Sequence, residues 1–376
     1  MTSKPAIMTA MFNQRPYNKQ FFLLTIVSLY LSLCASALAG PVSHLKSDET
    51  LVFFNTSAWL DEQSKSWHIP IHGWIYEPEK SIIRKTAIEK TLQITHKLTV
   101  TAQNRRQFDR RVNALLADNE RGKKIIIRLA DRTYALPTSQ ANGHFKHILK
   151  IKAEHLNTTE HPLISFQAVL PPNDKRQFFG QVKLVKPTGL SIISDIDDTI
   201  KISGVTDRRT LLDNTFYQPF KAVPGMAAMY QQWLSTDGAL HFVSSSPWQL
   251  YPELHEFIDS AGFPVADYAL KSFRFKDKTL MNLLAKSTET KPPQITEILT
   301  RYPNRRFILV GDSGEYDPEI YAQIQKKYPT QIQLILIRNV TEERVDNKRF
   351  QALFKHLEPH QWQLFRNTEE IKYTTR

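Results

Sequence analysis

Acidic side chains follow two apolar segments of this sequence, in a spacing that suits metal-assisted chemistry. Five carboxylates come just after the runs 190–194 and 306–310: Asp195, Asp197, Asp198, Asp312 and Asp317. If the runs are neighbouring parallel strands, these side chains meet at one edge of a sheet, where open α/β sheets bind ligands. Carboxylates gathered in one site raise one another's pKa unless a cation compensates. Because carboxylate oxygens suit a hard divalent cation, the sequence predicts a Mg²⁺ site.

The two acids of the Asp-Ile-Asp segment can take different roles in phosphoryl transfer. Asp195, at the strand end, can attack phosphorus, and Asp197, two residues further on, can shuttle a proton. A hydroxyl such as Ser244, after another apolar run, and a lysine would neutralise and orient the phosphoryl oxygens. We expect Asp198 to be instead a solvated acid of the turn or a helix N-cap, with Thr199 orienting the loop by hydrogen bonds.

A parallel sheet is needed to hold these residues, and the second half of the chain has the pattern of one. Four apolar runs are typical of buried strands: 190–194, 239–243, 306–310 and 332–337. Helical spacing appears between and after them at 225–234, 250–261, 294–302 and 318–328. This alternation predicts a doubly wound α/β domain, with an amphipathic helical tail over 341–376.

The first half of the chain has a different texture. Short segments of alternating polarity are separated by turn-forming residues: 67–76, 123–129, 145–151, 163–170 and 179–185. This pattern predicts an all-β, antiparallel, sandwich-like N-terminal domain, interrupted by a helical insertion within 89–119. We therefore divide the chain into a β-rich accessory domain over 40–187 and a catalytic domain over 188–376.

The N-terminal residues 1–39 have the features of a secretory signal peptide. Three basic residues and no acid precede a short apolar run, and Ala39 ends a small-residue cleavage site. The predicted product is exported, periplasmic or secreted, and an uncleaved N-terminal membrane anchor is the alternative. The one cysteine, Cys34, lies in this segment, which excludes an intrachain disulfide framework and a cysteine-cluster metal site.

The length and charge of the chain limit the number of its domains and the kinds of partner that it could bind. A chain of 376 residues with 41% hydrophobic residues is long and apolar enough for about two globular domains. Its formal charge of +12 suits anionic lipid headgroups, phosphorylated substrates or nucleic acid. Lys and Arg are spread along the chain, so a solvated surface explains much of this excess, and no nucleic-acid partner is expected.

The ordered motifs resemble those of the haloacid dehalogenase (HAD) superfamily of aspartate-nucleophile phosphatases. The segments 194–201, 224–226, 243–250, 262–264 and 310–321 are similar, more narrowly, to the phosphatidate phosphatase catalytic domain of the actin-patch-protein type. The close resemblance covers about residues 190–338. It implies a HAD-like Rossmannoid fold and a Mg²⁺-dependent hydrolysis of phosphatidate to diacylglycerol and phosphate.

The resemblance also implies roles for individual residues. Asp195 would form a phosphoaspartate, Asp197 would act as acid and then base, and Ser244 would bind the phosphoryl group. Asp195, the Asp197 carbonyl and Asp312 would hold Mg²⁺, with Asp317 nearby. The hydroxyls of Thr199 and Ser245 are predicted to help bind substrate.

The phosphate-binding lysine is less clear in the sequence. Lys291 stands where the family has a His-Lys pair, but Thr290 replaces the histidine and two prolines follow. Lys286 and Lys271 therefore stay candidates beside it.

Two other functions compete with phosphatidate hydrolysis. One is an exported phosphatase of soluble or protein phosphoesters, and the other is an envelope-binding module with a vestigial catalytic domain. Aromatic and basic residues in 201–223, such as Arg208 and Phe216, fit either contact with an anionic amphiphile or loop packing. An anionic phospholipid substrate would bring peripheral membrane contact with it.

Overall fold

The structure is a computed structural model that describes residues 40–156, 162–234, 237–272 and 288–373. Residues from Ser43 to Arg376 form one compact unit. The predicted signal peptide lies outside the described residues, and so does Lys286. Among the described residues, no helix is both long and apolar enough to cross a membrane.

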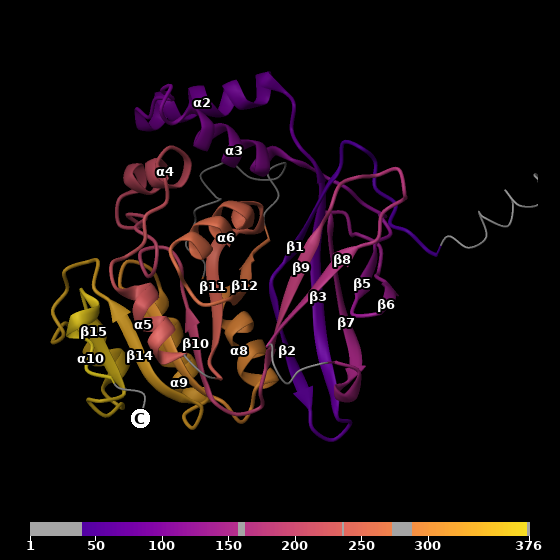
Figure 1. The fold of residues 1–376 in the computed structure, drawn as a ribbon. Helices are drawn as coiled ribbons and strands as arrows, with labels where there is room; N and C mark the ends of the chain where they lie inside the picture. Colours follow the sequence, from indigo (N-terminus) through magenta and orange to yellow (C-terminus); the bar gives the residue numbers. More distant parts are fainter. Residues whose placement is uncertain (1–39, 157–161, 235–236, 273–287, 374–376) are drawn as a thin grey trace, which may run out of the picture. The chain divides into compact units, whose positions relative to one another are not determined.

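A six-stranded parallel sheet occupies the second half of the chain, as the strand pattern predicts (Figure 1). Its strands lie in the order β12-β11-β10-β13-β14-β15, and every neighbouring pair is parallel. The strands are β10 (Leu190–Ser194), β11 (Ala239–Pro247), β12 (Ala266–Lys271), β13 (Arg306–Asp312), β14 (Ile332–Arg338) and β15 (Trp362–Phe365). The sheet places β10 between β11 and β13, which brings their carboxyl ends together.

Helices cover both faces of this sheet. The helices are α4 (Arg208–Phe216), α5 (Met226–Trp233), α6 (Tyr251–Ser260), α8 (Lys291–Arg301), α9 (Asp317–Lys327) and α10 (Lys348–Phe354). Ile192 packs in one buried cluster with residues of α5 and α6, and its neighbour Ile193 packs in another with residues of α8 and α9. Adjacent residues of a strand point to opposite faces, so the two clusters lie on the two sides of the sheet.

The tail departs from its predicted helix. Within the described part of the tail, residues 341–373, α-helix is confined to Lys348–Phe354, and Trp362–Phe365 forms β15 at the edge of the sheet. Phe350 and Phe354 of α10 enter the buried cluster beneath α9, whereas β15 pairs with β14. The apolar periodicity of the tail comes from the burial of Phe350 and Phe354. The second part of the expected helix is instead a strand, which pairs with the open edge of the sheet.

A nine-stranded sheet dominates the first half of the chain. Its strands are β1 (Thr50–Phe54), β2 (Thr56–Asp61), β3 (Ser66–Glu77), β4 (Asp118–Asn119), β5 (Ile126–Leu129), β6 (Arg132–Ala135), β7 (His144–Lys152), β8 (Leu163–Ala168) and β9 (Phe179–Val185). The sheet is mixed where we expected an antiparallel one, because β2 and β9 run parallel.

This half also contains two helices, α2 (Ile82–His96) and α3 (Arg105–Leu116), so it is not all-β. The predicted helical insertion is therefore present, but it begins earlier and is broken in the middle. Lys97 caps α2 in the left-handed conformation with φ 54°, which ends that helix. Asn104 then begins α3.

Side chains from the first half enter the core of the second. Phe54 belongs to the same buried cluster as Leu254 of α6 and Ile192 of β10. Its ring centroid lies 4.3 Å from that of Trp248 and 4.8 Å from that of Tyr251. The backbone N–H of Asn55 donates a hydrogen bond to the Tyr251 hydroxyl at 3.0 Å. Trp248 directly follows β11, so this packing supports the segment that carries the predicted substrate-binding serines.

Candidate active site

Strand pairing brings the two acidic segments together. β10 and β13 pair in parallel with Ser194 opposite Val310, and the Asp195 N–H donates to the Val310 carbonyl at 2.9 Å. Asp195 thus stands one residue past β10, beside Asp312 at the end of β13. The predicted gathering of acids at one sheet edge is present in the structure.

Three buried carboxylates form the centre of this group. Carboxylate oxygens of Asp195, Asp312 and Asp317 lie within 4.8 Å of one another, and each residue is at most 1% exposed. Asp317 is the first residue of α9, where the helix dipole favours a negative charge. Gly311 lets it approach, because a Cβ at Gly311 would collide with the Asp317 carboxylate.

Lys291 lies among these carboxylates, which distinguishes it from the other candidate lysine that the structure describes, Lys271 at the end of β12. Its Nζ is 2.9 Å from Asp195 Oδ1, 2.6 Å from Asp317 Oδ1 and 3.1 Å from Glu315 Oε2. The two prolines after it occupy the first turn of α8, where the backbone N–H groups need no helical partner. They therefore start the helix at Lys291 and fix its position; its catalytic role stays a prediction.

The charges of this cluster perturb one another strongly. Burial raises the pKa of Asp195 well above its usual value, and the neighbouring Asp317 and Glu315 raise it further, although Lys291 opposes them. Burial and the same acidic neighbours raise the pKa of Asp312, and burial raises the pKa of Glu315. The cluster thus holds more negative charge than one lysine neutralises.

The donor set fits a hard divalent cation. Asp312 Oδ1 accepts hydrogen bonds from the N–H groups of Gly314 at 2.7 Å and Glu315 at 3.0 Å, whereas its buried Oδ2 has no hydrogen-bond partner among the described residues. An unsatisfied buried carboxylate oxygen is costly, and a bound cation would satisfy it. Asp195, Asp312 and Asp317 are the residues that could hold Mg²⁺.

The Asp197 carboxylate lies outside this three-carboxylate group and has its own partners. Its Oδ1 is 2.7 Å from both Lys201 Nζ and Ser203 Oγ, and its Oδ2 accepts from Ser246 Oγ at 2.8 Å. Burial raises the pKa of Asp197, but Lys201 and the two hydroxyls outweigh it, so the pKa lies below its usual value. These contacts favour the ionised carboxylate, and both the acid–base role of Asp197 and metal binding through its carbonyl stay predictions.

Asp198 closes the turn with its carboxylate, but it is buried rather than solvated, with 5% of its surface exposed. It adopts a left-handed conformation with φ 51°, and its carboxylate accepts from the N–H groups of Ser203 at 2.8 Å and Val205 at 2.6 Å. These bonds close the turn that follows Asp195 and Asp197. The turn in this way places Ser203 against the Asp197 carboxylate.

The predicted substrate-binding hydroxyls surround the same edge. Thr199 Oγ1 donates to Asp195 Oδ2 at 3.5 Å, so it lies beside the predicted nucleophile. Ser244 Oγ accepts the Ser246 N–H at 3.0 Å. The buried Ser245 Oγ has no hydrogen-bond partner among the described residues. The positions of these hydroxyls are compatible with phosphate binding, which stays a prediction.

Four residues of the site were not expected from the sequence: Lys201, Ser203, Ser246 and Glu315. Lys201 stands four residues after Asp197 and is 2% exposed, so its spacing was the available signal. Glu315 lies within the segment between Asp312 and Asp317. Glu315 and Ser246 reach their partners from other loops, and a pattern along the chain does not show such pairs.

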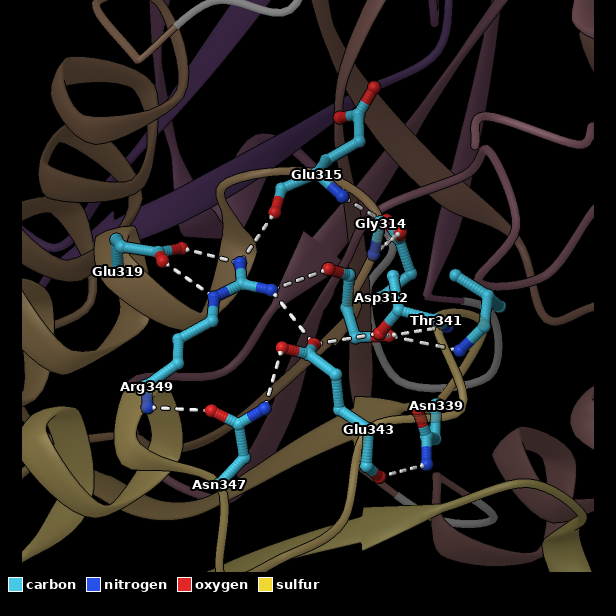
Figure 2. A network of polar contacts seen from close by, with 11 residues as sticks. Asp312, Gly314, Glu315, Glu319, Asn339, Thr341, Glu343, Asn347 and Arg349 are labelled. Atoms are coloured by element: carbon cyan, nitrogen blue, oxygen red, sulfur yellow. Dashed lines mark hydrogen bonds and ion pairs between the residues drawn. The ribbon is translucent and has the colours of Figure 1, made fainter. Parts of the chain in front are cut away.

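A second layer of polar contacts holds the Asp312 loop (Figure 2). The Arg349 guanidinium donates to the carbonyls of Ser313 at 2.8 Å and Glu315 at 2.9 Å. It also pairs with Glu319 at 2.7 Å and Glu343 at 3.2 Å. Arg349 therefore ties α10 to the loop whose N–H groups orient the Asp312 carboxylate.

Comparisons with known proteins address the same region. Residues 190–339 match a family model described as the catalytic domain of phosphatidate phosphatase APP1. The match begins at the first residue of β10 and ends just after β14, so it includes Asp195, Lys291 and Asp312. The resemblance given by the motifs is confirmed.

Two curated proteins are similar over parts of this chain. Phosphatidate phosphatase APP1 of Saccharomyces cerevisiae is 37% identical over 158 residues, which are 41% of this chain and 26% of that protein. An uncharacterized protein of Schizosaccharomyces pombe is 30% identical over 195 residues, 50% of this chain and 32% of that protein. The matched regions thus span about a third or less of either relative.

Proposed function

We propose that this chain is a Mg²⁺-dependent phosphomonoester phosphatase that hydrolyses phosphatidate to diacylglycerol and phosphate. The observation that carries the proposal is the buried group of Asp195, Asp312 and Asp317 with Lys291 among them. The family match and the yeast relative's name support phosphatidate as substrate. Because the chain spans only part of that relative, the substrate belongs to the proposal.

The first half of the reaction transfers the phosphoryl group to Asp195. An Asp195 carboxylate oxygen attacks phosphorus, and the bond between phosphorus and the glycerol oxygen breaks. Asp197 in its protonated form gives its proton to that departing oxygen, which releases diacylglycerol. The Lys291 ammonium, 2.9 Å from Asp195 Oδ1, neutralises charge on the transferring group.

The second half hydrolyses the phosphoaspartate. The Asp197 carboxylate, the form that Lys201, Ser203 and Ser246 stabilise, takes a proton from water as that water attacks phosphorus. The phosphorus–Asp195 bond breaks, and phosphate leaves with the carboxylate regenerated. A divalent cation held by Asp195, Asp312 and Asp317 would supply charge neutralisation for the phosphoryl oxygens when bound.

The proposal is tested by phosphate release from purified protein. Phosphatidate in vesicles and water-soluble phosphomonoesters are offered side by side, with Mg²⁺ and with a chelator. We expect Mg²⁺-dependent release from phosphatidate by the wild type and only background release by Asp195→Asn. Strong activity on soluble esters with none on phosphatidate would replace the lipid assignment with the soluble-ester alternative.

Absence of any phosphate release from the wild type would instead favour a vestigial binding module. Export of the chain after cleavage near Ala39 also stays a proposal, because it rests on the N-terminal sequence alone.

A further inference from the structure

Helix α2 exposes three isoleucines on its outer face. Ile82, Ile83 and Ile94 are 74%, 82% and 79% exposed, whereas Ile88 and Leu92 of the same helix are buried. At about 100° per residue, the exposed isoleucines fall within an arc of about 120°, and the two buried residues lie opposite them. Packing inside the protein explains why the inner face of α2 is apolar, but it does not explain the isoleucines on the outer face.

Positive charge surrounds the exposed isoleucines. Residues 79–111 contain nine Lys and Arg against three acids, a net +6, although Arg110 and Arg111 pair with Glu253 of α6. The three acids take part in ion pairs: Glu79 with Arg84, Glu89 with Arg105, and Asp109 with Lys85 and Arg105. Lys90 projects within the arc of the isoleucines by the same helical spacing, and Lys97 caps the helix.

The helix also stands over the elements that build the active site (Figure 1). One buried cluster joins Ile88 and Leu92 of α2 to Phe108 of α3 and to Leu212 and Phe216 of α4. Phe216 of the 201–223 segment is therefore used in packing, one of its two predicted roles. Figure 1 draws α2 as the outermost of these three helices.

Polar contacts continue this connection to the catalytic loop. Arg209 of α4 donates to the His96 carbonyl at the end of α2, at 3.1 Å. Asn214 of α4 donates to the Ser203 carbonyl at 3.0 Å, and Ser203 Oγ bonds to Asp197. The α2 surface is thus joined through α4 to the edge of the sheet where the substrate would bind.

We propose that the outer face of α2 docks on an anionic lipid membrane and so presents the active site to its lipid substrate, an inference that rests on the proposed function. Ile82, Ile83 and Ile94 would enter the boundary between headgroups and acyl chains, and Lys90 and Lys97 would meet lipid phosphates. Apolar side chains combined with lysines are the chemistry of an interfacial helix.

A second copy of this chain is the less suitable occupant. A two-fold interface places the same patch on both partners, so Lys90 and Lys97 of one copy would approach the same lysines of the other. The cores of protein interfaces are depleted in lysine, whereas anionic headgroups attract it. Charge complementarity therefore favours the membrane.

The test measures flotation of the full chain with vesicles of equimolar phosphatidylcholine and phosphatidylserine. Phosphatidylserine is anionic but is not a phosphomonoester, so binding is separated from recognition at the active site. We expect Ile82→Ser/Ile83→Ser/Ile94→Ser to lower the vesicle partition coefficient at least about tenfold. Lys90→Glu/Lys97→Glu should lower it by a similar factor and weaken its dependence on salt.

A matched control replaces the same number of exposed apolar residues elsewhere. Ile148, Phe179 and Val345 are 46%, 58% and 55% exposed, and their triple serine variant should bind vesicles like the wild type. All variants are checked for folding by circular dichroism. Hydrolysis of a soluble aryl phosphate should be the same for the α2 variant and the wild type, while hydrolysis of vesicle phosphatidate falls.

Two results would overturn the docking proposal. One is that the α2 isoleucine variant floats with the vesicles to the same extent as the wild type. The other is a wild type that does not bind the vesicles but self-associates through the isoleucines, as sedimentation of both proteins would show. Flotation is independent of turnover, so a protein that binds vesicles through α2 and releases no phosphate would refute the proposed function and leave the docking surface standing.

Discussion

Lys291 places a positive charge among Asp195, Glu315 and Asp317, and most of the site's electrostatics depend on it. Those three carboxylates raise its pKa well above the usual value against the opposing effect of burial. The lysine is therefore charged whenever substrate arrives. The same charge can stabilise the transferring phosphoryl group, because it lies 2.9 Å from one oxygen of the carboxylate proposed as nucleophile.

We predict that Lys291→Met lowers kcat by about a hundredfold to a thousandfold, the usual effect of removing one group that stabilises transition-state charge. Steady-state kinetics on a soluble phosphomonoester at saturating Mg²⁺ measure this effect, and thermal unfolding checks that the variant is folded. Lys271→Met, the change at the other candidate lysine that the structure describes, should keep most of the activity. The reverse ranking of the two variants would assign the phosphate to Lys271.

The site was predictable from the sequence where a residue's place on a strand determines its position. Asp195, Ser244 and Asp312 follow apolar strands, and parallel pairing then brings them to one edge. Glu315 was missed because its contact with Lys291 joins two different loops, whereas Lys201 lies only four residues after Asp197 and its spacing was the signal overlooked. Lys291 was one of three candidates, and the start of α8 at the prolines decides its position.

At the scale of elements, α10 and the loop before it support the loop after β13, whose N–H groups orient Asp312. Arg349 donates to the Ser313 and Glu315 carbonyls, and the N–H of Glu315 donates to Asp312. Nothing in the local sequence indicates this contact, because Arg349 lies 37 residues beyond Asp312 along the chain. The strand β15 was missed for a similar reason, since its pairing with β14 is not visible in the periodicity of the tail.

We predict that Arg349→Ala weakens Mg²⁺ binding about tenfold to a hundredfold, as loss of a group that orients a metal ligand commonly does. The Mg²⁺ concentration that gives half-maximal activity measures this change, and kcat at saturating Mg²⁺ should fall much less. Arg344→Ala is the matched control, because Arg344 is 85% exposed in its side chain and pairs with Asp346. Equal Mg²⁺ dependence of the two variants would contradict the supporting role of Arg349.

A histidine pair joins two strands of the nine-stranded sheet beside Trp248. His72 Nε2 of β3 lies 3.0 Å from His144 Nδ1 of β7, and His72 packs against the Trp248 ring at 4.6 Å between centroids. Burial, with a smaller effect of the Lys146 charge, lowers the pKa of His144 to about 4. Burial and the charges of Lys146 and His144 also lower the pKa of His72.

We predict that acid destabilises the fold through this pair. Each histidine binds a proton more weakly in the folded state, so its contribution is complete above the unfolded pKa of about 6.5 and is lost as the pH falls toward the folded value. For His144, the change from 6.5 to about 4 corresponds to at most ~3 kcal/mol.

Urea unfolding between pH 7 and pH ~4 measures the loss, which follows from the linkage of proton binding to folding. His144→Asn should reduce the fall in unfolding free energy over this range, whereas His147→Asn on the same strand should leave it unchanged. An identical pH dependence for wild type and His144→Asn would show that other groups control acid stability.

For the whole molecule, the packing of Phe54 against Trp248 and Tyr251 connects the nine-stranded sheet with the six-stranded parallel sheet. The division into segments 40–187 and 188–376 stays a prediction. Most strands of both segments were predictable, because alternation and continuous apolar runs report burial on one or both faces. The core that the two segments share was not predictable, because the sequence around Phe54 does not distinguish it from a strand residue buried within its own sheet.

We predict that the two sheets unfold together in one thermal transition. Phe53→Ala tests this, because Phe53 is buried within the nine-stranded sheet's own cluster and its loss should cost about 3–5 kcal/mol. The variant should shift a single transition that circular dichroism and loss of phosphatase activity follow together. Two separate thermal transitions would show independent domains, if Phe53→Ala shifted only the transition that leaves phosphatase activity unchanged.

The central claim is that Asp195 carries the phosphoryl group, and an acid-quenched turnover with phosphatidate radiolabelled in its phosphate tests it most directly. Asp197 serves both steps of the proposed reaction, so the wild type itself is quenched during turnover, and label should appear on it and be absent from Asp195→Asn. Peptide mapping should place that label at Asp195 as a hydroxylamine-sensitive acyl phosphate. Release of labelled phosphate by the wild type with no label on the protein, or with label at another residue, would contradict the account.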